Sequence, residues 1–147
     1  MFIPTLDTLA DIADKTITGD ALLTQRKLAQ YIVNDRLAHY VFTAKDNQLT
    51  LAQDIRLAFE NRQTPDFSEA YTVAHGRIES RSIWTSTLLN DYLDFPFVGQ
   101  IFAIHRHTIN KKSGKDSVAS TIEKLARNVR RVFDYLRMTE NSRKVIV

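Results

Sequence analysis

Four polar side chains alternate with other residues in the segment HGRIESR, which spans residues 75–81. Successive side chains of an extended strand point to opposite faces, so alternate positions would share one face. Two arginines on one face can bind a phosphate through charge-assisted hydrogen bonds. The same pattern is also that of a solvent-exposed strand with cross-strand ion pairs, and the residues alone leave both interpretations open. The four side chains are those of His75, Arg77, Glu79 and Arg81.

Two other patterns could bind a metal ion. Asp20 ends a β-branched segment, residues 15–21, that predicts a short strand. A carboxylate in this position can bind a divalent cation, or it can simply be a polar residue that ends the strand. His105 and His107 lie two residues apart on another predicted strand and would point the same way, but no third ligand accompanies them.

Positive charge is concentrated toward the C-terminus. The 147-residue chain has a formal charge of +3, whereas residues 111–147 hold ten Lys/Arg against four Asp/Glu, a net of +6. A basic segment of this kind, if it forms a helix, favours weak, sequence-independent binding to the DNA backbone. A solvated helix with no such partner is the other interpretation. The candidate DNA-binding residues of this helix are Lys124, Arg127, Arg130 and Arg131.

Composition excludes several classes of protein. The chain contains no cysteine, which excludes disulfides and a thiolate zinc site. No run approaches the ~18 apolar residues of a membrane span, and the N-terminus lacks the pattern of a signal peptide. We therefore expect a cytoplasmic protein without a membrane partner.

Hydrophobic spacing predicts strands that alternate with helices in the first sixty residues, which is the rhythm of an α/β sheet. Further along, the chain predicts strands over 70–83 and 98–109, a short helix over 86–93 and a turn over 110–114. The clearest amphipathic pattern predicts a helix over 117–138. In the first sixty residues the helices are expected over 5–14, 25–36 and 51–60, and the strands over 15–21 and 39–44.

Several segments in this order resemble one protein family. The resemblance is to DDE-type insertion-sequence transposases, in their H-repeat-associated branch, and it covers most of the chain. HGRIESR following KDNQLTL is its most specific part. The matching segments are TITGDALLTQRKLAQYIV (16–33), HYVFTAKDNQLTL (39–51), AHGRIESRSIW (74–84), VGQIFAIHRHTINKKSGK (98–115) and SVASTIEKLARNVRRVFDYLRM (117–138).

The resemblance implies a ribonuclease-H-like fold in which two Asp and one Glu bind Mg²⁺ for cleavage and joining of DNA. It matches Asp20 to the second Asp, and it places the motif with His75 and Glu79 beside the active site. We expect the strand with the first Asp and the helix with the Glu to be missing from this chain. Asp20 would then bind a metal only weakly, and Mg²⁺ would not be retained.

The expected fold is α/β, with a partial ribonuclease-H-like mixed sheet, helices and a β-rich insertion over 1–115, followed by a basic amphipathic helix over 116–147. The expected function is that of a transposase-related protein of an insertion sequence, as a remnant that does not cleave DNA. The alternative is a non-enzymatic module that binds DNA or interferes with an intact transposase. The strand that ends at Asp20 would leave one edge unpaired, so we also expect self-association.

Overall fold

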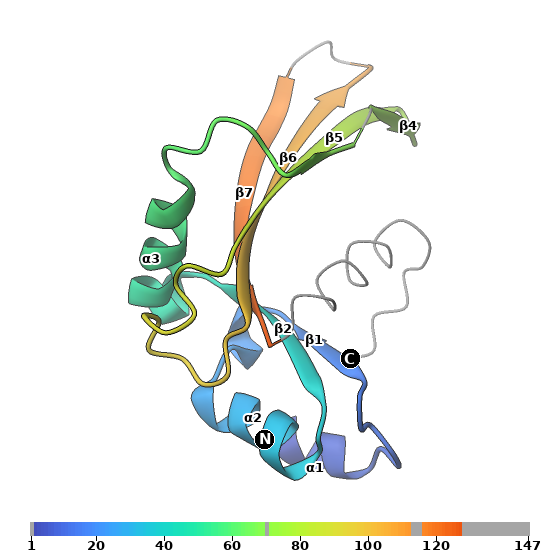
Figure 1. Cartoon of the computed structure of the whole chain (residues 1–147). Helices are drawn as coiled ribbons and strands as arrows, with labels where there is room; N and C mark the ends of the chain where they lie inside the picture. Colours follow the sequence, from blue (N-terminus) through green and yellow to red (C-terminus); the bar gives the residue numbers. More distant parts are fainter. Residues whose placement is uncertain (1, 70, 113–115, 128–147) are drawn as a thin grey trace.

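One mixed β-sheet organises the chain, and helices lie against it (Figure 1). The structure is a computed structural model that describes residues 2–69, 71–112 and 116–127. None of the helices in these residues is long and apolar enough to span a membrane. The helices are α1 (Phe2–Asp7), α2 (Arg26–Gln30), which continues as a π-helical turn (Tyr31–Asp35), and α3 (Leu49–Phe59).

In the described residues, the sheet has seven strands in the order β1-β2-β7-β6-β5-β3, and β4 also pairs with β5. Only β1 and β2 are parallel to each other, and the other pairs are antiparallel. A parallel pair needs a crossover, which residues 21–38 provide with α2. The strands are β1 (Thr16–Gly19), β2 (His39–Ala44), β3 (Phe67–Ser68), β4 (Thr72–Ala74), β5 (Arg77–Ser86), β6 (Gln100–Asn110) and β7 (Asp116–Ala126).

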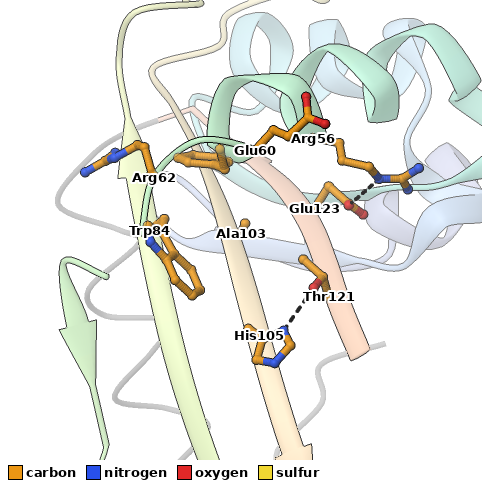
Figure 2. A pocket seen from close by; sticks show the side chains of 9 residues that line it. Arg56, Glu60, Arg62, Trp84, Ala103, His105, Thr121 and Glu123 are labelled. Carbon is orange, nitrogen blue, oxygen red and sulfur yellow. Dashed lines mark hydrogen bonds and ion pairs between the residues drawn. The ribbon is translucent and has the colours of Figure 1, made fainter. Parts of the chain in front are cut away.

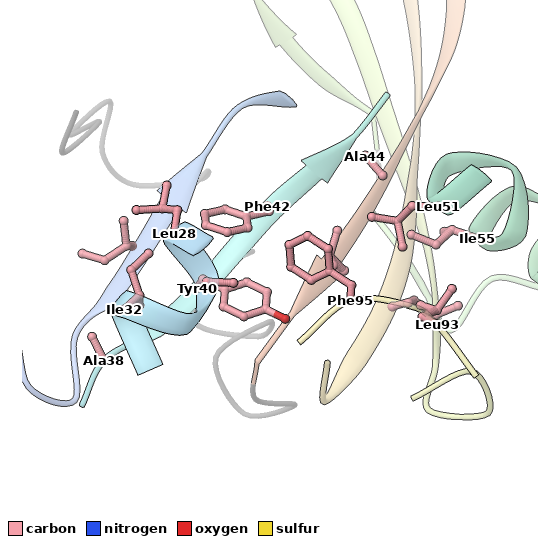
Figure 3. Close-up of a cluster of buried hydrophobic side chains, with 14 of the residues drawn as sticks. Leu28, Ile32, Ala38, Tyr40, Phe42, Ala44, Leu51, Ile55, Leu93 and Phe95 are labelled. Carbon is pink, nitrogen blue, oxygen red and sulfur yellow. The ribbon is translucent and has the colours of Figure 1, made fainter. Parts of the chain in front are cut away.

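The main core lies between the helices and one face of the sheet, which we call the helix-covered face (Figure 3). The rings of Tyr40 and Phe42 on β2 stack with centroids 4.7 Å apart, and Phe95 meets Tyr40 edge-on at 5.9 Å. α3 buries Leu51 and Ile55, whose spacing of four places them on one side of the helix. Phe95 comes from the turns between β5 and β6, so this connection closes the core.

The opposite side of the sheet, which we call the second face, carries a smaller apolar cluster. Strand alternation sends Val41, between Tyr40 and Phe42, to this side. Beyond α3, the long strands continue into an extension of the sheet (Figure 1). We call this extension the arm, made of residues 72–82, 105–112 and 116–121. The buried residues of the second-face cluster are Val41, Ile83, Phe102, Ile104 and Ala126.

Most elements of the first sixty residues are confirmed. The strand expected over 39–44 is β2, and the helix expected over 51–60 is α3, which begins at Leu49. The strand expected over 98–109 is also present, as β6. These segments combine the expected periodicity with burial of the apolar positions, so local pattern and tertiary packing agree.

The amphipathic helix expected from residue 117 is wrong over the described residues. Residues 116–126 form β7, which pairs with β2 on one side and β6 on the other. β7 therefore belongs to the same sheet as residues 16–110. Apolar side chains spaced by three and four satisfied a helical pattern, but two neighbouring strands offered hydrogen bonds on both sides, and tertiary pairing prevailed. Residues 128–147 lie outside the described part.

Three further expectations need correction. The helix expected over 5–14 is α1, which ends at Asp7, and residues 8–14 are not helical. The single strand expected over 70–83 is a hairpin of β4 and β5, whose two-residue turn is His75–Gly76. Both turn residues have positive φ angles, 50° and 75°, as the tight turns that suit the twist of a hairpin require. The short helix expected over 86–93 is a series of turns instead.

Gly19 provides a test of how closely β1 packs on the core. A Cβ atom at this position would lie 2.9 Å from Cδ1 of Phe42 and 2.9 Å from Cβ of Leu23. Phe42 is fully buried and stacked on Tyr40, so its ring cannot move without disturbing the core. We expect Gly19→Ala to lower the free energy of unfolding by about 1–3 kcal/mol in urea denaturation.

A double-mutant cycle with Phe42→Leu identifies the cause. The smaller side chain leaves room for the new methyl group, so Gly19→Ala should cost less in the Phe42→Leu background than in the wild type. An equal cost in both backgrounds would show that the Phe42 ring is not the source of the clash.

Candidate functional site

Asp20 lies at the carboxyl end of β1, where the parallel pair β1–β2 ends. The register that places Gly19 opposite Phe42 brings Asp20 beside Thr43, and Thr43 is directly opposite Lys124 on β7. Asp20, Thr43 and Lys124 therefore form one row across three neighbouring strands. The side chain of Asp20 is exposed, and its Oδ1 accepts a hydrogen bond of 3.0 Å from the Leu22 backbone N–H.

Hydroxyl groups connect the members of this row. Nζ of Lys124 donates to Oγ1 of Thr43 at 2.7 Å. Oγ1 of Thr43 in turn lies 3.4 Å from the carbonyl oxygen of Gly19, to which it can donate. Thr24 is fully buried, and its hydroxyl donates to the Thr43 carbonyl at 2.5 Å. The carboxyl ends of β1 and β2 are thus tied to β7 and to the start of the crossover.

Lys124 does not lie on an exposed basic helix as expected, because it is buried in the middle of the sheet. Its exposed fraction is 7%. Burial is the main cause that lowers the pKa of its ammonium group to about 8; the charge of Lys45 acts in the same direction, and Asp20 acts in the opposite direction. Buried in this way, Lys124 is poorly placed to reach a DNA phosphate.

The donor groups around Asp20 do not fit Mg²⁺. Mg²⁺ requires near-octahedral oxygen ligands, usually with more than one carboxylate or phosphate. Asp20 supplies a single carboxylate, and the charged group that interacts with it is the cationic side chain of Lys124. No group of three His, Cys, Asp or Glu among the described residues could hold a metal ion, and this applies also to His105 and His107.

The arginines of the HGRIESR motif lie on the second face of the arm. Arg77, Glu79 and Arg81 alternate along β5 and share this face, whereas His75 belongs to the hairpin turn and not to the strand. Arg81 and Glu79 form an ion pair with Nη2 and Oε2 3.8 Å apart. The expectation of a shared strand face is therefore correct for three of the four residues.

Sequence patterns did not identify Arg106, which is the basic neighbour of Arg81 across the sheet. The β5–β6 register places the two residues directly opposite each other. Arg106 is exposed and forms no ion pair with any residue that the structure describes. Nε of Arg81 is buried and has no hydrogen-bond partner among these residues. Only the register reveals this pair, because the two arginines are 25 positions apart in sequence.

A pocket of about 290 Å³ lies between the C-terminal end of α3 and the helix-covered face (Figure 2). Trp84, Ala103 and Glu123 are register neighbours, so the small side chain of Ala103 leaves space between the two larger ones. Nε1 of Trp84 is buried without a hydrogen-bond partner in the described part of the chain. The pocket is lined by Arg56, Phe59, Glu60, Arg62, Trp84, Ala103, His105, Thr121 and Glu123.

Ion pairs within the fold occupy most of the charges of this pocket. Nε of Arg56 donates to the buried carboxylate of Glu123 at 3.0 Å, and this contact holds the pKa of Arg56 above its usual range. Arg62 pairs with Asp66 at 2.9 Å and donates to a backbone carbonyl. Nδ1 of His105 is 3.1 Å from the Thr121 hydroxyl. The contacts of Arg56 and Arg62 bind α3 and the loop after it to the sheet, and the contact of His105 joins β6 to β7.

Of the other basic residues expected to bind DNA, Arg127 directly follows β7. Its backbone N–H donates to the Tyr40 carbonyl at 3.1 Å, and its guanidinium lies 5.6 Å from the centre of the Phe97 ring. Arg130 and Arg131 lie outside the described residues.

Comparison with known proteins identifies a relative in Xanthobacter autotrophicus. The chain is 36% identical over 96 residues to a protein of that organism named "Uncharacterized protein in dhlA 3'region". The match covers 63% of this chain and 31% of that protein, so the chain spans about a third of the length of its curated relative. No protein-family model matches the chain. No solved structure matches it either, so the ribonuclease-H-like fold and the transposase resemblance stay predictions.

The buried ammonium group of Lys124 predicts a distinctive dependence of stability on pH. A lysine in the unfolded chain has a pKa of about 10.4, so between pH 8 and pH 10 the unfolded state binds more protons than the folded state. Stability therefore rises with pH across this window. We expect the wild type to gain about 2 kcal/mol relative to Lys124→Met between pH 7 and pH 9.5 in urea denaturation.

The matched control for this experiment is Lys45→Met, which removes an exposed ammonium group nearby. This variant should keep most of the pH dependence of the wild type, because Lys124 stays buried. If the stability of the wild type and of Lys124→Met changed with pH in the same way, the lowered pKa of Lys124 would not be the source of the pH dependence.

Proposed function

We propose that this chain is a transposase-related protein of an insertion sequence that binds the DNA backbone through the second face of its arm and does not itself cleave DNA. The resemblance supports the descent, through the position of Asp20 at a strand end and the HGRIESR motif, of which residues 77–81 lie on β5. The observation that carries the DNA-binding part is the pairing of Arg81 with Arg106 across β5 and β6.

Two like charges directly opposite each other destabilise a sheet unless something neutralises them. Glu79 does so only in part, because its contact with Arg81 is 3.8 Å long and Arg106 has no ion-pair partner among the described residues. An oxyanion bound between the two guanidinium groups would relieve the repulsion and accept their N–H groups. A DNA phosphate has this chemistry.

Further basic residues extend the surface along the arm. Arg77 lies on the same face of β5 as Arg81, and Lys111 and Lys112 follow the end of β6. All three residues are exposed. A strand surface of this kind contacts phosphates without reading base edges, so the binding is weak and independent of sequence.

The metal-dependent DNA cleavage that the resemblance implies needs several carboxylates around the metal ions. Among the described residues, Asp20 has no carboxylate neighbours that could complete such a set. We therefore propose that this chain alone leaves DNA intact, and that its contribution is binding.

Salt-dependent DNA binding tests this proposal. We expect the wild type to bind scrambled duplexes equally, with log affinity falling linearly as log salt rises. Arg81→Gln combined with Arg106→Gln should reduce the slope by about 0.9 for each phosphate that the protein no longer neutralises. Fluorescence anisotropy at several salt concentrations measures both the affinity and the slope.

Lys27→Gln is the control, because Lys27 is exposed on α2, away from the arm. It should bind DNA almost as the wild type does. An unchanged slope in the double variant, or a strong preference for one duplex, would refute the arm as the binding surface. Nicking of supercoiled plasmid in the presence of Mg²⁺ would refute the non-cleaving part.

The expected self-association has its own support in β1. Among the described strands, β1 pairs only with β2, so its other edge has unpaired backbone groups. In the fold that the resemblance implies, the strand with the first Asp occupies this edge. We propose that a second copy of this chain can pair here, because Thr16 and Thr18 favour extended structure.

Charged residues on an edge strand discourage such pairing. We expect Thr18→Lys to shift the wild type from dimers or larger species toward monomers, measured by light scattering behind size-exclusion chromatography over a range of concentrations. Ser68→Lys on β3, at the other end of the sheet, is the matched control and should leave association unchanged. A wild type that is monomeric at high concentration would rule out pairing through β1.

A further inference from the structure

The row formed by Asp20, Thr43 and Lys124 places a positive charge where the resemblance implies a metal ion. Only β2 lies between the backbones of Asp20 and Lys124. Neighbouring strands are roughly 4.8 Å apart, so the two residues are close in space. The side chains of Thr43 and Lys124 share the second face, because the two residues are directly opposite in the β2–β7 pair. The ammonium group of Lys124 therefore points toward β2, which is the strand between β7 and β1.

The hydrogen bonds of the row hold this charge in place. Nζ of Lys124 is 2.7 Å from the Thr43 hydroxyl, which itself lies 3.4 Å from the carbonyl oxygen of the residue before Asp20. β7 is bonded on both sides, to β2 and β6, so Lys124 cannot withdraw without breaking the sheet. A bound ion can dissociate from such a position, but a side chain on an inner strand cannot.

We propose that the ammonium group of Lys124 is the built-in counter-ion of Asp20 and stands in place of the divalent metal ion that the resemblance implies. A divalent cation at Asp20 would be repelled by Lys124 and by Lys45, which follows the end of β2. The Asp20 carboxylate that it would bind already accepts the Leu22 N–H through Oδ1. The lowered pKa of Lys124, which Asp20 partly counteracts, agrees with electrostatic coupling between the two groups.

Titration with Mn²⁺, followed by NMR, tests the proposal without DNA, so its result is independent of the DNA-binding proposal. The amide of Leu22 is the reporter, because it donates to the Asp20 carboxylate. In the wild type, we expect no selective broadening of this signal at Mn²⁺ concentrations below about 1 mM, where a single solvated carboxylate binds little. In Lys124→Met, removal of the charge should increase Mn²⁺ affinity at Asp20 by about tenfold.

Two matched variants separate Lys124 from general charge effects. Lys45→Met removes an exposed charge that solvent screens, so it should change Mn²⁺ affinity less than Lys124→Met does. Asp20→Asn combined with Lys124→Met should abolish the broadening at Leu22. Lys124→Gln, which keeps a polar group for Thr43, replaces Lys124→Met if the methionine variant does not fold.

Selective broadening of Leu22 in the wild type at micromolar Mn²⁺ would overturn the proposal directly, whatever the variants do. Equal affinities in the wild type, Lys124→Met and Lys124→Gln would overturn it as well. Equal gains in Lys45→Met and Lys124→Met would show that net charge, and not the buried counter-ion, controls metal binding.

Discussion

The pairing of β2 with β7 is the constraint on which the rest of the structure depends. It joins the parallel pair β1–β2 to the long antiparallel strands, and it places both strands inside the sheet. Because β2 is buried from Tyr40 to Ala44, its side chains form the centre of two clusters, with Tyr40 and Phe42 on the helix-covered face and Val41 on the second face. Without this pairing, α3 and the turns that carry Phe95 would have no surface to cover.

The same pairing buries two opposite charges at consecutive positions of β7. Strand alternation sends Glu123 to the helix-covered face, where Arg56 binds it, and Lys124 to the second face, where Thr43 binds it. Burial removes a charged group from water, which costs free energy. The charges of Glu123 and Lys124 are therefore tolerated only in the arrangement that gives each of them its partner. A slip of one residue would exchange the two faces and leave both charges without partners. Glu123 and Lys124 therefore specify the register of β7, at a cost in stability.

The arm differs from this buried centre, because its charges are not all paired within the described part of the fold. Arg81 and Arg106 face each other across β5 and β6, and Glu79 contacts only Arg81 of the two. The charge without a partner among the described residues lies on an extension of the sheet that α1, α2 and α3 do not cover (Figure 1). Lys124 is positively charged like Arg81 and Arg106, but it is buried within the sheet. We propose that the arm binds external phosphates and that Lys124, at the sheet centre, neutralises Asp20.

The sequence alone determined the elements whose periodicity and burial agree: β2, α3 and β6, and the position of Asp20 at a strand end. It also determined that Arg77, Glu79 and Arg81 share one strand face, because alternation is a property of any strand. Tertiary structure decided that residues 116–126 form β7 and not a helix, since the hydrogen bonds that β2 and β6 offer are invisible in a local pattern. It likewise decided the opposition of Arg81 to Arg106 and the row from Asp20 to Lys124. Register between distant strands is set by which faces are buried, and no spacing within a single segment contains that information.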